Sequence, residues 1–436
     1  MRPACRTPKS KRCHGSGWSR SSERPVIRRP APASIGQTDA EVIVVGGGPA
    51  GSATALLLAR AGHSVLLLDK ASFPRHKACS EYINAGGVAA LDELGVLNEV
   101  LAAGAHRLTE MRIHSPEGGQ FAAQFDRAAP GRHALGLSRY RLDAMLLDAA
   151  RAAGATVIER AHARNVWLQP GASATVEVSC DGTTTRLRAP LVVGADGHHS
   201  CVTRSLGLEQ TRRWPRRVGL VAHYQQVAGN DHGGDMYVTS DGYAGLAPLE
   251  DRLTNIAVVV PEAHVQRRSG SIEELFEQRL AAVPELSRRL DGAVRIGNVR
   301  GIGRLGHRVR QPTGDGYLLV GDAAAFLDPF TGDGIYEALR GAQLAAPVIS
   351  RALAAGDVSA RALAPYRWER RRVFTMKRQL CWVVQGFVHT PAAMNYVTRR
   401  LERRETVGLE LAAALGNFRP AHTALTPHFL ARLLRP

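Results

Sequence analysis

The chain has 436 residues, of which 44% are hydrophobic and 22% charged, and its formal net charge is +17. This composition is typical of a globular protein with room for one large domain or two smaller ones, and no apolar run reaches the roughly 18 to 20 residues that span a bilayer. The basic excess is mostly arginine near the two ends of the chain, and no nucleic-acid-binding motif accompanies it, so we expect no nucleic-acid partner.

The first 38 residues are rich in arginine, serine and proline and show no hydrophobic periodicity. We expect this basic segment to be disordered, because it buries too little apolar surface to fold. It also lacks the apolar core of a signal peptide. The six cysteines form no CxxC pair and the sixteen histidines no HExxH motif, so we expect reduced thiols, a cytoplasmic location and no metal site.

A strand–helix–strand unit begins at residue 41. EVIVV (41–45) is a continuous apolar run, as in a strand buried on both faces. SATALLLARAG (52–62) has helical spacing, and HSVLLLDK (63–70) is a second buried strand. About 30 residues in this order are typical of a unit with two parallel strands joined by a helix.

The turn between the first strand and the helix has the spacing Gly46-x-Gly48-x-x-Gly51. Gly46 allows a tight turn, Gly48 lets the backbone approach a pyrophosphate, and Gly51 lets helix and strand pack closely. The helix start presents free N–H groups to the phosphates, and Asp69, at the end of the second strand, would accept hydrogen bonds from a ribose. The sequence therefore predicts a dinucleotide site.

Further α/β pieces alternate with β-rich ones along the chain. LVVGADG (191–197) and YLLVGDAA (317–324) read as buried strands that end in turns, and residues 215 to 262 read as several β-strands. We predict an α/β fold in which a Rossmann-like domain is built from residues 39–110, 139–205 and 296–355. An interleaved β-sheet substrate domain takes residues 111–138 and 206–295, and a basic helical region takes residues 356–436.

A second GxGxxG match occurs at Gly301, Gly303 and Gly306. The residues that follow, HRVRQPTGDG, contain a proline and no helical pattern. Without a helix start there is no anion site, so we interpret this match as chance.

Three motifs together carry a family resemblance: GGGPAG (46–51), GADGHHS (194–200) and GDAAAFLDPFTGDGI (321–335). In this order they resemble the FAD-dependent monooxygenase superfamily, of the flavoprotein aromatic hydroxylase type. The third motif and RHKACSEYINAGG (75–87) are most similar to its geranylgeranyl-reductase-like branch. The resemblance covers roughly residues 41 to 350 and implies bound FAD, with NAD(P)H as a transient reductant.

Residues 321 to 335 then have a physical interpretation. Asp322 ends a buried strand and is placed to hydrogen-bond the flavin ribityl, while Pro329 stiffens the chain past the ring. Glycines 332 and 334 let the backbone run close to the ring, and the helix from Ile335 points its N–H groups at the flavin N1/C2 edge. The predicted cofactor-binding residues are Gly46, Gly48, Ala50, Gly51, Asp69, Lys70, Arg75, Lys77, Arg139, Asp196, Gly197, Gly321, Asp322, Pro329, Gly332, Gly334 and Ile335.

Several of these roles rest on the resemblance. It implies that Asp196 and Gly197 contact the pyrophosphate region and help NAD(P)H to dock, and that Arg139 lies along the FAD phosphates. Arg75 and Lys77 would line the flavin entrance. Cys79 stands where the reductase-like branch has a cysteine, although Ser80 replaces the usual glycine after it.

Two reactions compete for this flavin. One is hydroxylation of an aromatic or lipid-like small molecule with O₂, and the other is hydride transfer to a prenyl double bond. The reductase branch and the related halogenases carry an aromatic run of the Tyr-x-Trp-x-Phe-Pro kind; here Tyr243 and Pro248 remain, but Gly245 and Ala247 replace Trp and Phe. The smaller side chains predict a roomier cavity, so we favour hydroxylation. Tyr243 and Cys79 are candidate catalytic residues, and we assign no catalytic residue firmly.

A third hypothesis is a flavin-binding protein without turnover. The basic and apolar C-terminal helices would suit contact with an anionic membrane surface, from which an apolar aromatic or isoprenoid substrate could be taken. We favour instead that these helices pack their apolar side on the rest of the protein.

Overall fold

The computed structural model describes residues 39–169, 173–211, 216–229, 233–303, 305–326 and 328–435. The first 38 residues, for which the sequence predicts disorder, lie outside the described part. All described residues belong to the unit Gln37–Pro436.

A six-stranded sheet contains the predicted strand–helix–strand unit. Its strand order is β20-β21-β12-β1-β2-β8, parallel throughout except for β20. The strands are β1 (Val42–Val45), β2 (Val65–Leu68), β8 (Thr156–Ile158), β12 (Leu191–Gly194), β20 (Thr313–Gly314) and β21 (Tyr317–Leu319). Strands from three separated parts of the chain therefore lie side by side in one sheet.

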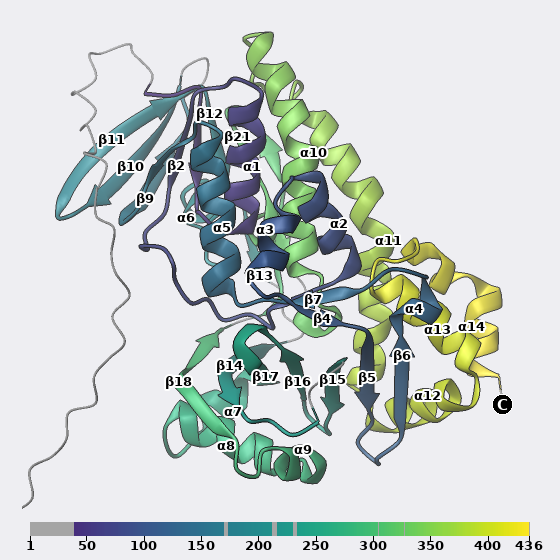
Figure 1. Ribbon diagram of the computed structural model, residues 1–436. Helices are drawn as coiled ribbons and strands as arrows, with labels where there is room; N and C mark the ends of the chain where they lie inside the picture. The colour runs from purple at the N-terminus through teal and green to yellow at the C-terminus, as the bar shows by residue number, and fades with distance from the viewer. Residues whose placement is uncertain are drawn as a thin grey trace, which may run out of the picture. The chain divides into compact units, whose positions relative to one another are not determined.

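Both faces of this sheet are covered, as the continuous apolar runs predict. Helices α1 (Pro49–Arg60), α5 (Arg139–Ala152) and α10 (Gly334–Ala354) lie on one face, and the small sheet of β9 (Ala161–Trp167), β10 (Ala174–Cys180) and β11 (Thr183–Ala189) lies on the other (Figure 1). Alternate side chains of β1 enter the two cores: Val42 and Val44 pack with the helices, and Ile43 and Val45 with the small sheet. The predicted Rossmann-like α/β fold is confirmed.

A seven-stranded sheet forms a second layer, in the order β18-β14-β17-β16-β15-β5-β6. Its strands are β5 (Glu110–His114), β6 (Gln120–Gln124), β14 (Arg217–Gln225), β15 (Gly233–Val238), β16 (Tyr243–Pro248), β17 (Leu253–Pro261) and β18 (Val294–Ile302). The sequence assigned residues from 296 onward to the Rossmann-like domain, whereas β18 pairs with β14 in this second sheet. The glycines of the second GxGxxG match thus begin in a sheet strand, and strand β19 (His307–Val309) follows them.

The C-terminal region is helical, as predicted, with α11 (Ala364–Val388), α12 (Pro391–Arg403), α13 (Glu405–Leu415) and α14 (Pro427–Leu434). These helices pack on β6, where Phe121 shares a core with Leu380, Val397 and Leu401. Among the described residues, no helix combines the length and apolarity needed to cross a bilayer.

The remaining elements connect these layers. A three-stranded sheet joins β3 (Tyr82–Ile83), β7 (Ala134–Gly136) and β4 (His106–Leu108). The other elements are α2 (Ala85–Glu93), α3 (Leu97–Ala102), α4 (Phe125–Ala128), α6 (Cys201–Ser205), α7 (Glu262–Gln266), α8 (Ile272–Ala281), α9 (Pro284–Arg289), β13 (Glu209–Thr211) and β22 (Ala325–Phe326).

Candidate cofactor and substrate site

The three sequence motifs follow the carboxyl ends of neighbouring parallel strands. Gly46 follows β1, Asp196 follows β12 shortly after its last residue, and Gly321 follows β21. A Cβ added to Gly321 would lie 2.8 Å from the Cβ of Ala50, so the first and third motifs touch. Open α/β sheets bind their ligands at this edge, and the chain thus gathers turns that lie up to 275 residues apart in sequence, from Gly46 to Gly321.

The turn after β1 is shaped by backbone packing. Gly46 has φ +105°, and a Cβ there would lie 2.5 Å from the carbonyl oxygen of Ala195. A Cβ on Gly51 would lie 1.8 Å from the carbonyl oxygen of Gly46, so only glycine lets α1 approach the strand end. Asp69 accepts hydrogen bonds from the backbone N–H of Gly47 (2.7 Å) and of Ala71 (2.8 Å) and so fixes the turn.

The Cβ direction of Gly48 is open and faces two guanidinium groups. A Cβ there would lie 3.7 Å from Nη2 of Arg139 and 3.8 Å from Nη2 of Arg75. Both arginines are held by the buried Asp143, at 2.5 Å from Arg139 Nε and 2.8 Å from Arg75 Nη1. No side chain caps the start of α1, whose first N–H groups have no intrahelical acceptor. This cradle of two cations and a helix start fits a pyrophosphate.

The N-terminus of α10, like that of α1, has no side-chain cap. Asp333 occupies the N-cap position, yet its side chain makes no capping hydrogen bond to the helix. Its carboxylate is engaged by Asn84, Thr331, Lys377 and Asn417 instead. The first N–H groups of α10 are therefore available to an electron-rich ligand edge.

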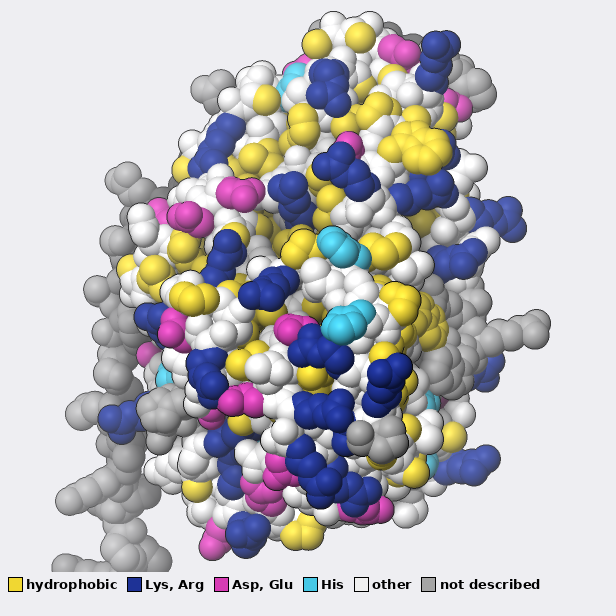
Figure 2. All heavy atoms as spheres, turned by 90° about the vertical axis from the view of Figure 1, so that its right-hand side faces the viewer, with side chains coloured by type: hydrophobic (Ala, Val, Ile, Leu, Met, Phe, Trp, Pro, Cys, Tyr) yellow, Lys and Arg dark blue, Asp and Glu magenta, His cyan; other side chains and the backbone are white. Residues whose placement is uncertain are grey.

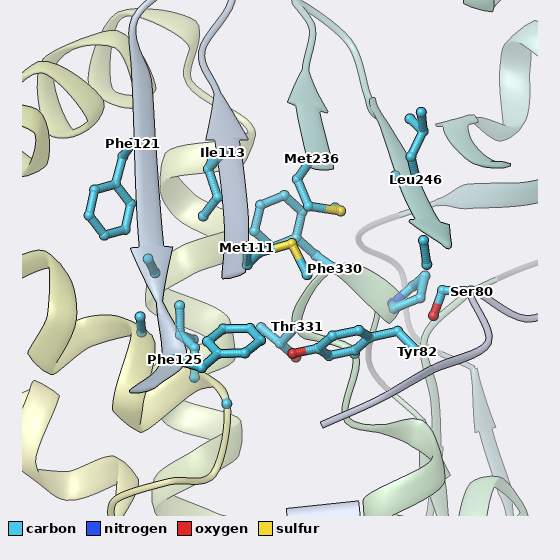
Figure 3. Close-up of a pocket in the computed structure, with 18 of the residues that line it drawn as sticks. Ser80, Tyr82, Met111, Ile113, Phe121, Phe125, Met236, Leu246, Phe330 and Thr331 are labelled. Carbon is cyan, nitrogen blue, oxygen red and sulfur yellow. The ribbon is translucent and has the colours of Figure 1, made fainter. Parts of the chain in front are cut away.

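An apolar cavity of about 860 Å³, including its part open to solvent, adjoins the stretch Pro329–Gly332 (Figure 3). Its walls come from β5, β6, β15, β16 and α13, and its large apolar side chains include Met111, Phe121, Phe125, Met236, Leu411 and Leu415. Among the described lining residues no side chain is charged, and hydroxyl groups come only from Ser80, Tyr82 and Thr331. In Figure 3 the ring of Tyr82 extends toward Phe125 and Thr331.

Residues 39–378 match the family described as FAD binding domain. The chain belongs to this family. Digeranylgeranylglycerophospholipid reductase 2 of Methanopyrus kandleri is 31% identical over 78% of this chain and 85% of that protein. Menaquinone reductase of Mycobacterium tuberculosis is 30% identical over 72% of this chain and 78% of that protein. The solved structure of CmlS, a flavin-dependent halogenase, is 25% identical with a TM-score of 0.71, over 79% of this chain and 64% of that one.

The protein is accordingly an FAD-dependent oxidoreductase. Its own side chains suit the cofactor. The buried Oδ1 of Asp196 has no hydrogen-bond partner among the described residues, while Oδ2 accepts from the N–H of Cys201 at 2.6 Å. Asp322 likewise receives no hydrogen bond within the described part of the chain, although Lys77 and Arg139 act on it electrostatically. Both strand-end carboxylates are thus free to accept hydrogen bonds from the hydroxyl groups of FAD.

We expect Asp322 to make the affinity for FAD depend on pH. Burial raises its pKa from 3.8 to about 6, against the opposing charges of Lys77 and Arg139. In the expected site, ribityl hydroxyls would donate to the ionised form. FAD binding should therefore tighten as the pH rises toward about 6, by at most about tenfold per pH unit, and level off above it. Asp322→Asn should bind FAD roughly tenfold more weakly at neutral pH, because a hydrogen bond to a charged group is lost, and should show no such rise.

Fluorescence titration with FAD at several pH values measures this effect. The FAD-free protein offers an independent check with a defined sign. Because its folded pKa is raised, Asp322 favours folding less above about pH 6 than below its ordinary pKa. Asp322→Asn should therefore gain stability relative to wild type as the pH rises, and a wild-type FAD affinity that is flat across this window would contradict the role assigned to Asp322.

The two candidate catalytic residues have other partners in the structure. The hydroxyl of Tyr243 donates to Asp328 at 2.6 Å, its ring is buried, and it does not line the cavity. Burial raises the pKa of the Cys79 thiol, which disfavours the thiolate form of a nucleophile. A catalytic role for either residue stays a prediction.

Two groups that position the site were not predicted from the sequence. Asp143 bridges Arg75 and Arg139, and its place four residues after Arg139 on α5 was the available signal. Glu81 is buried with φ +58°, accepts from the backbone N–H of Arg139 at 2.7 Å, and lies 2.5 Å from Nε2 of His223. It connects the arginine cradle to β14 of the second sheet, and it stands in the reductase-like element noted above.

Proposed function

We propose that the protein uses FAD to reduce a carbon–carbon double bond in an apolar isoprenoid molecule, with NAD(P)H as the reductant. The observation that carries this proposal is the uncharged cavity beside Pro329–Gly332, lined by phenylalanine, methionine and leucine. Burial of a hydrocarbon ligand against such a wall contributes about 25 cal/mol of binding free energy per Å² of apolar surface. The wall offers almost no polar groups for recognition. The names of the archaeal and mycobacterial relatives, which are reductases, support the same substrate class.

Different residues of the chain would bind the phosphates, orient the flavin and form the cavity. The cradle at Gly48 holds the phosphates, and the open start of α10 orients the flavin edge toward the cavity. Reduced FAD, when bound, supplies the hydride equivalent. The cavity wall excludes water, and Tyr82 keeps its proton on Oη at neutral pH because burial raises its pKa. Its hydroxyl can therefore donate a hydrogen bond to an oxygen of the substrate.

Hydroxylation with O₂, which the sequence favoured, is the second candidate. It is supported by Gly245 and Ala247, which line the cavity where the reductase-type run has tryptophan and phenylalanine. The space that these small residues leave suits a bulkier ring than a linear prenyl chain.

Product mass spectrometry on a panel of prenyl compounds and phenolic lipids separates the two reactions. We expect a product that gains two hydrogens without O₂ in the presence of NAD(P)H. A product that is one oxygen heavier and forms only with O₂ would instead establish hydroxylation. Ala247→Phe should bind FAD like wild type but lower kcat/KM for bulky substrates by roughly tenfold, because it overfills the cavity.

Peripheral membrane contact also stays a prediction. Trp368, Met376 and Val383 are exposed along one side of α11, and the guanidinium of Arg371 lies 5.6 Å from the Trp368 ring centre. On the side of the molecule shown in Figure 2, basic side chains are spread among hydrophobic ones rather than gathered into one patch. Cosedimentation with anionic vesicles tests the contact, and an unchanged result with Trp368→Ala would argue against this face.

A further inference from the structure

Asp333 lies between two glycines of the third motif and carries a buried carboxylate, 7% exposed. Its Oδ1 accepts from the side-chain amides of Asn84 (3.0 Å) and Asn417 (2.7 Å), and its Oδ2 accepts from Thr331 Oγ1 (2.6 Å). None of these donors is charged, so on their own they would leave a negative charge next to the open start of α10.

Lys377 provides the positive charge. It projects from the middle of α11, is 3% exposed, and places Nζ 3.2 Å from Oδ1 of Asp333. Nζ also donates to the carbonyl oxygens of Ala414 (3.1 Å) and Leu415 at the end of α13, the helix that forms one wall of the cavity. Each of its three donor hydrogens therefore has an acceptor.

The pair is costly to bury if its purpose is only to hold the fold together. Removing two charges from water offsets most of their attraction, and apolar replacements of buried pairs are often neutral or stabilising. The position of the pair indicates a different role. It lies at the helix start that faces the flavin edge in the site proposed above, where a nearby charge acts through a medium of low polarity.

We propose that Lys377 is a positioning residue that sets how readily the bound FAD is reduced, by neutralising Asp333. FAD gains one negative charge when it takes up a hydride from NAD(P)H, which leaves as NAD(P)⁺. An uncompensated Asp333 carboxylate would oppose that charge, whereas the ion pair leaves the positive end of α10 to stabilise it. This inference rests on the proposed placement of FAD.

The test is the midpoint potential of bound FAD, measured by dye equilibration at one fixed pH. Lys377→Met should shift the potential to more negative values, equivalent to roughly a tenfold loss of preference for reduced over oxidised FAD. Adding Asp333→Asn to that variant should restore the wild-type potential, because the opposing charge is gone. The matched control is Arg370→Met, which removes another buried cation of α11 about 10 Å away along the helix and should leave the potential unchanged.

The outcomes are distinguishable from failure of the site itself. If wild type binds no FAD, or binds it equally well with Gly48→Val, the proposed placement is wrong. If FAD is bound and Lys377→Met keeps the wild-type potential, the inference is overturned. It is also overturned if the double variant stays shifted, or if Arg370→Met shifts equally. Should Lys377→Met fail to fold, Asp333→Asn alone serves, and its potential should become less negative.

Discussion

Gly48→Val should abolish FAD binding and leave the protein folded. Gly48 has φ −76° and ψ −176°, an extended conformation that valine adopts readily. Within the described part of the chain, its Cβ direction meets only the ends of Arg139 and Arg75. The branched side chain would occupy the space that a pyrophosphate needs between the helix start and these arginines. We expect FAD affinity to fall by roughly 100-fold or more, about 3 kcal/mol, without a change in the urea unfolding midpoint.

Two glycine variants provide controls for this result. Gly51→Val should not fold, because its Cβ would overlap the carbonyl oxygen of Gly46 at 1.8 Å. Gly303→Val, at the middle glycine of the second GxGxxG match, should fold and bind FAD like wild type, because no atom of the described residues beyond its chain neighbours lies within 4 Å of a Cβ placed there. Flavin absorbance of the purified variants measures all three, and a Gly48→Val protein that remains yellow would contradict the site.

Asp328→Ala should lower the free energy of unfolding by roughly 3 to 5 kcal/mol. The Asp328 side chain is 1% exposed, and its Oδ1 accepts from Tyr243 (2.6 Å), Gln385 (2.7 Å) and the N–H of Phe330 (3.0 Å). Its Oδ2 lies 3.4 Å from Nη1 of the buried Arg217. Alanine would leave that guanidinium without its carboxylate and three donors without an acceptor.

Tyr243→Phe is the matched variant for this network. It removes one donor and leaves Asp328 with its other partners, so we expect a loss of only about 1 kcal/mol in urea unfolding. Turnover should stay close to wild type, because Tyr243 reaches Asp328 and not the cavity. A Tyr243→Phe protein with normal stability but no turnover would restore the catalytic role that the sequence suggested.

Asp328 and Lys377 both stabilise the loop between β21 and α10. Asp328 lies in the loop between β21 and α10 and contacts side chains of β14, β16 and α11. Asp333, in the same loop, pairs with Lys377, which also contacts the end of α13. The loop between β21 and α10 is therefore held from the substrate side by two separate buried networks. A rigid loop between the cofactor site and the cavity would hold the flavin and the substrate in a fixed relative orientation. Such orientation is a main contribution of the protein in a flavoenzyme.

The sequence by itself determined the parts whose physics is local. A buried strand, a Gly-x-Gly-x-x-Gly turn and a helix occupy about 20 consecutive residues, and their φ angles and packing need glycine at fixed positions. The same holds for Gly321 and Asp322 after a buried strand. The fold class and a dinucleotide site followed from these motifs, and the FAD cofactor followed from their resemblance to the FAD-dependent monooxygenase superfamily.

Only the tertiary structure decided what depends on contacts between distant segments. β18 pairs with β14, a strand some 70 residues earlier in the chain. The local sequence of a strand does not indicate which sheet it joins, because pairing depends on contacts with distant strands. The cavity takes its walls from β5, β6 and α13, some 300 residues apart, and Lys377 meets Asp333 only when α11 packs beside α10. The sequence shows which residues are charged. Which two charged residues form a buried pair depends on which surfaces pack together, and only the folded structure shows this.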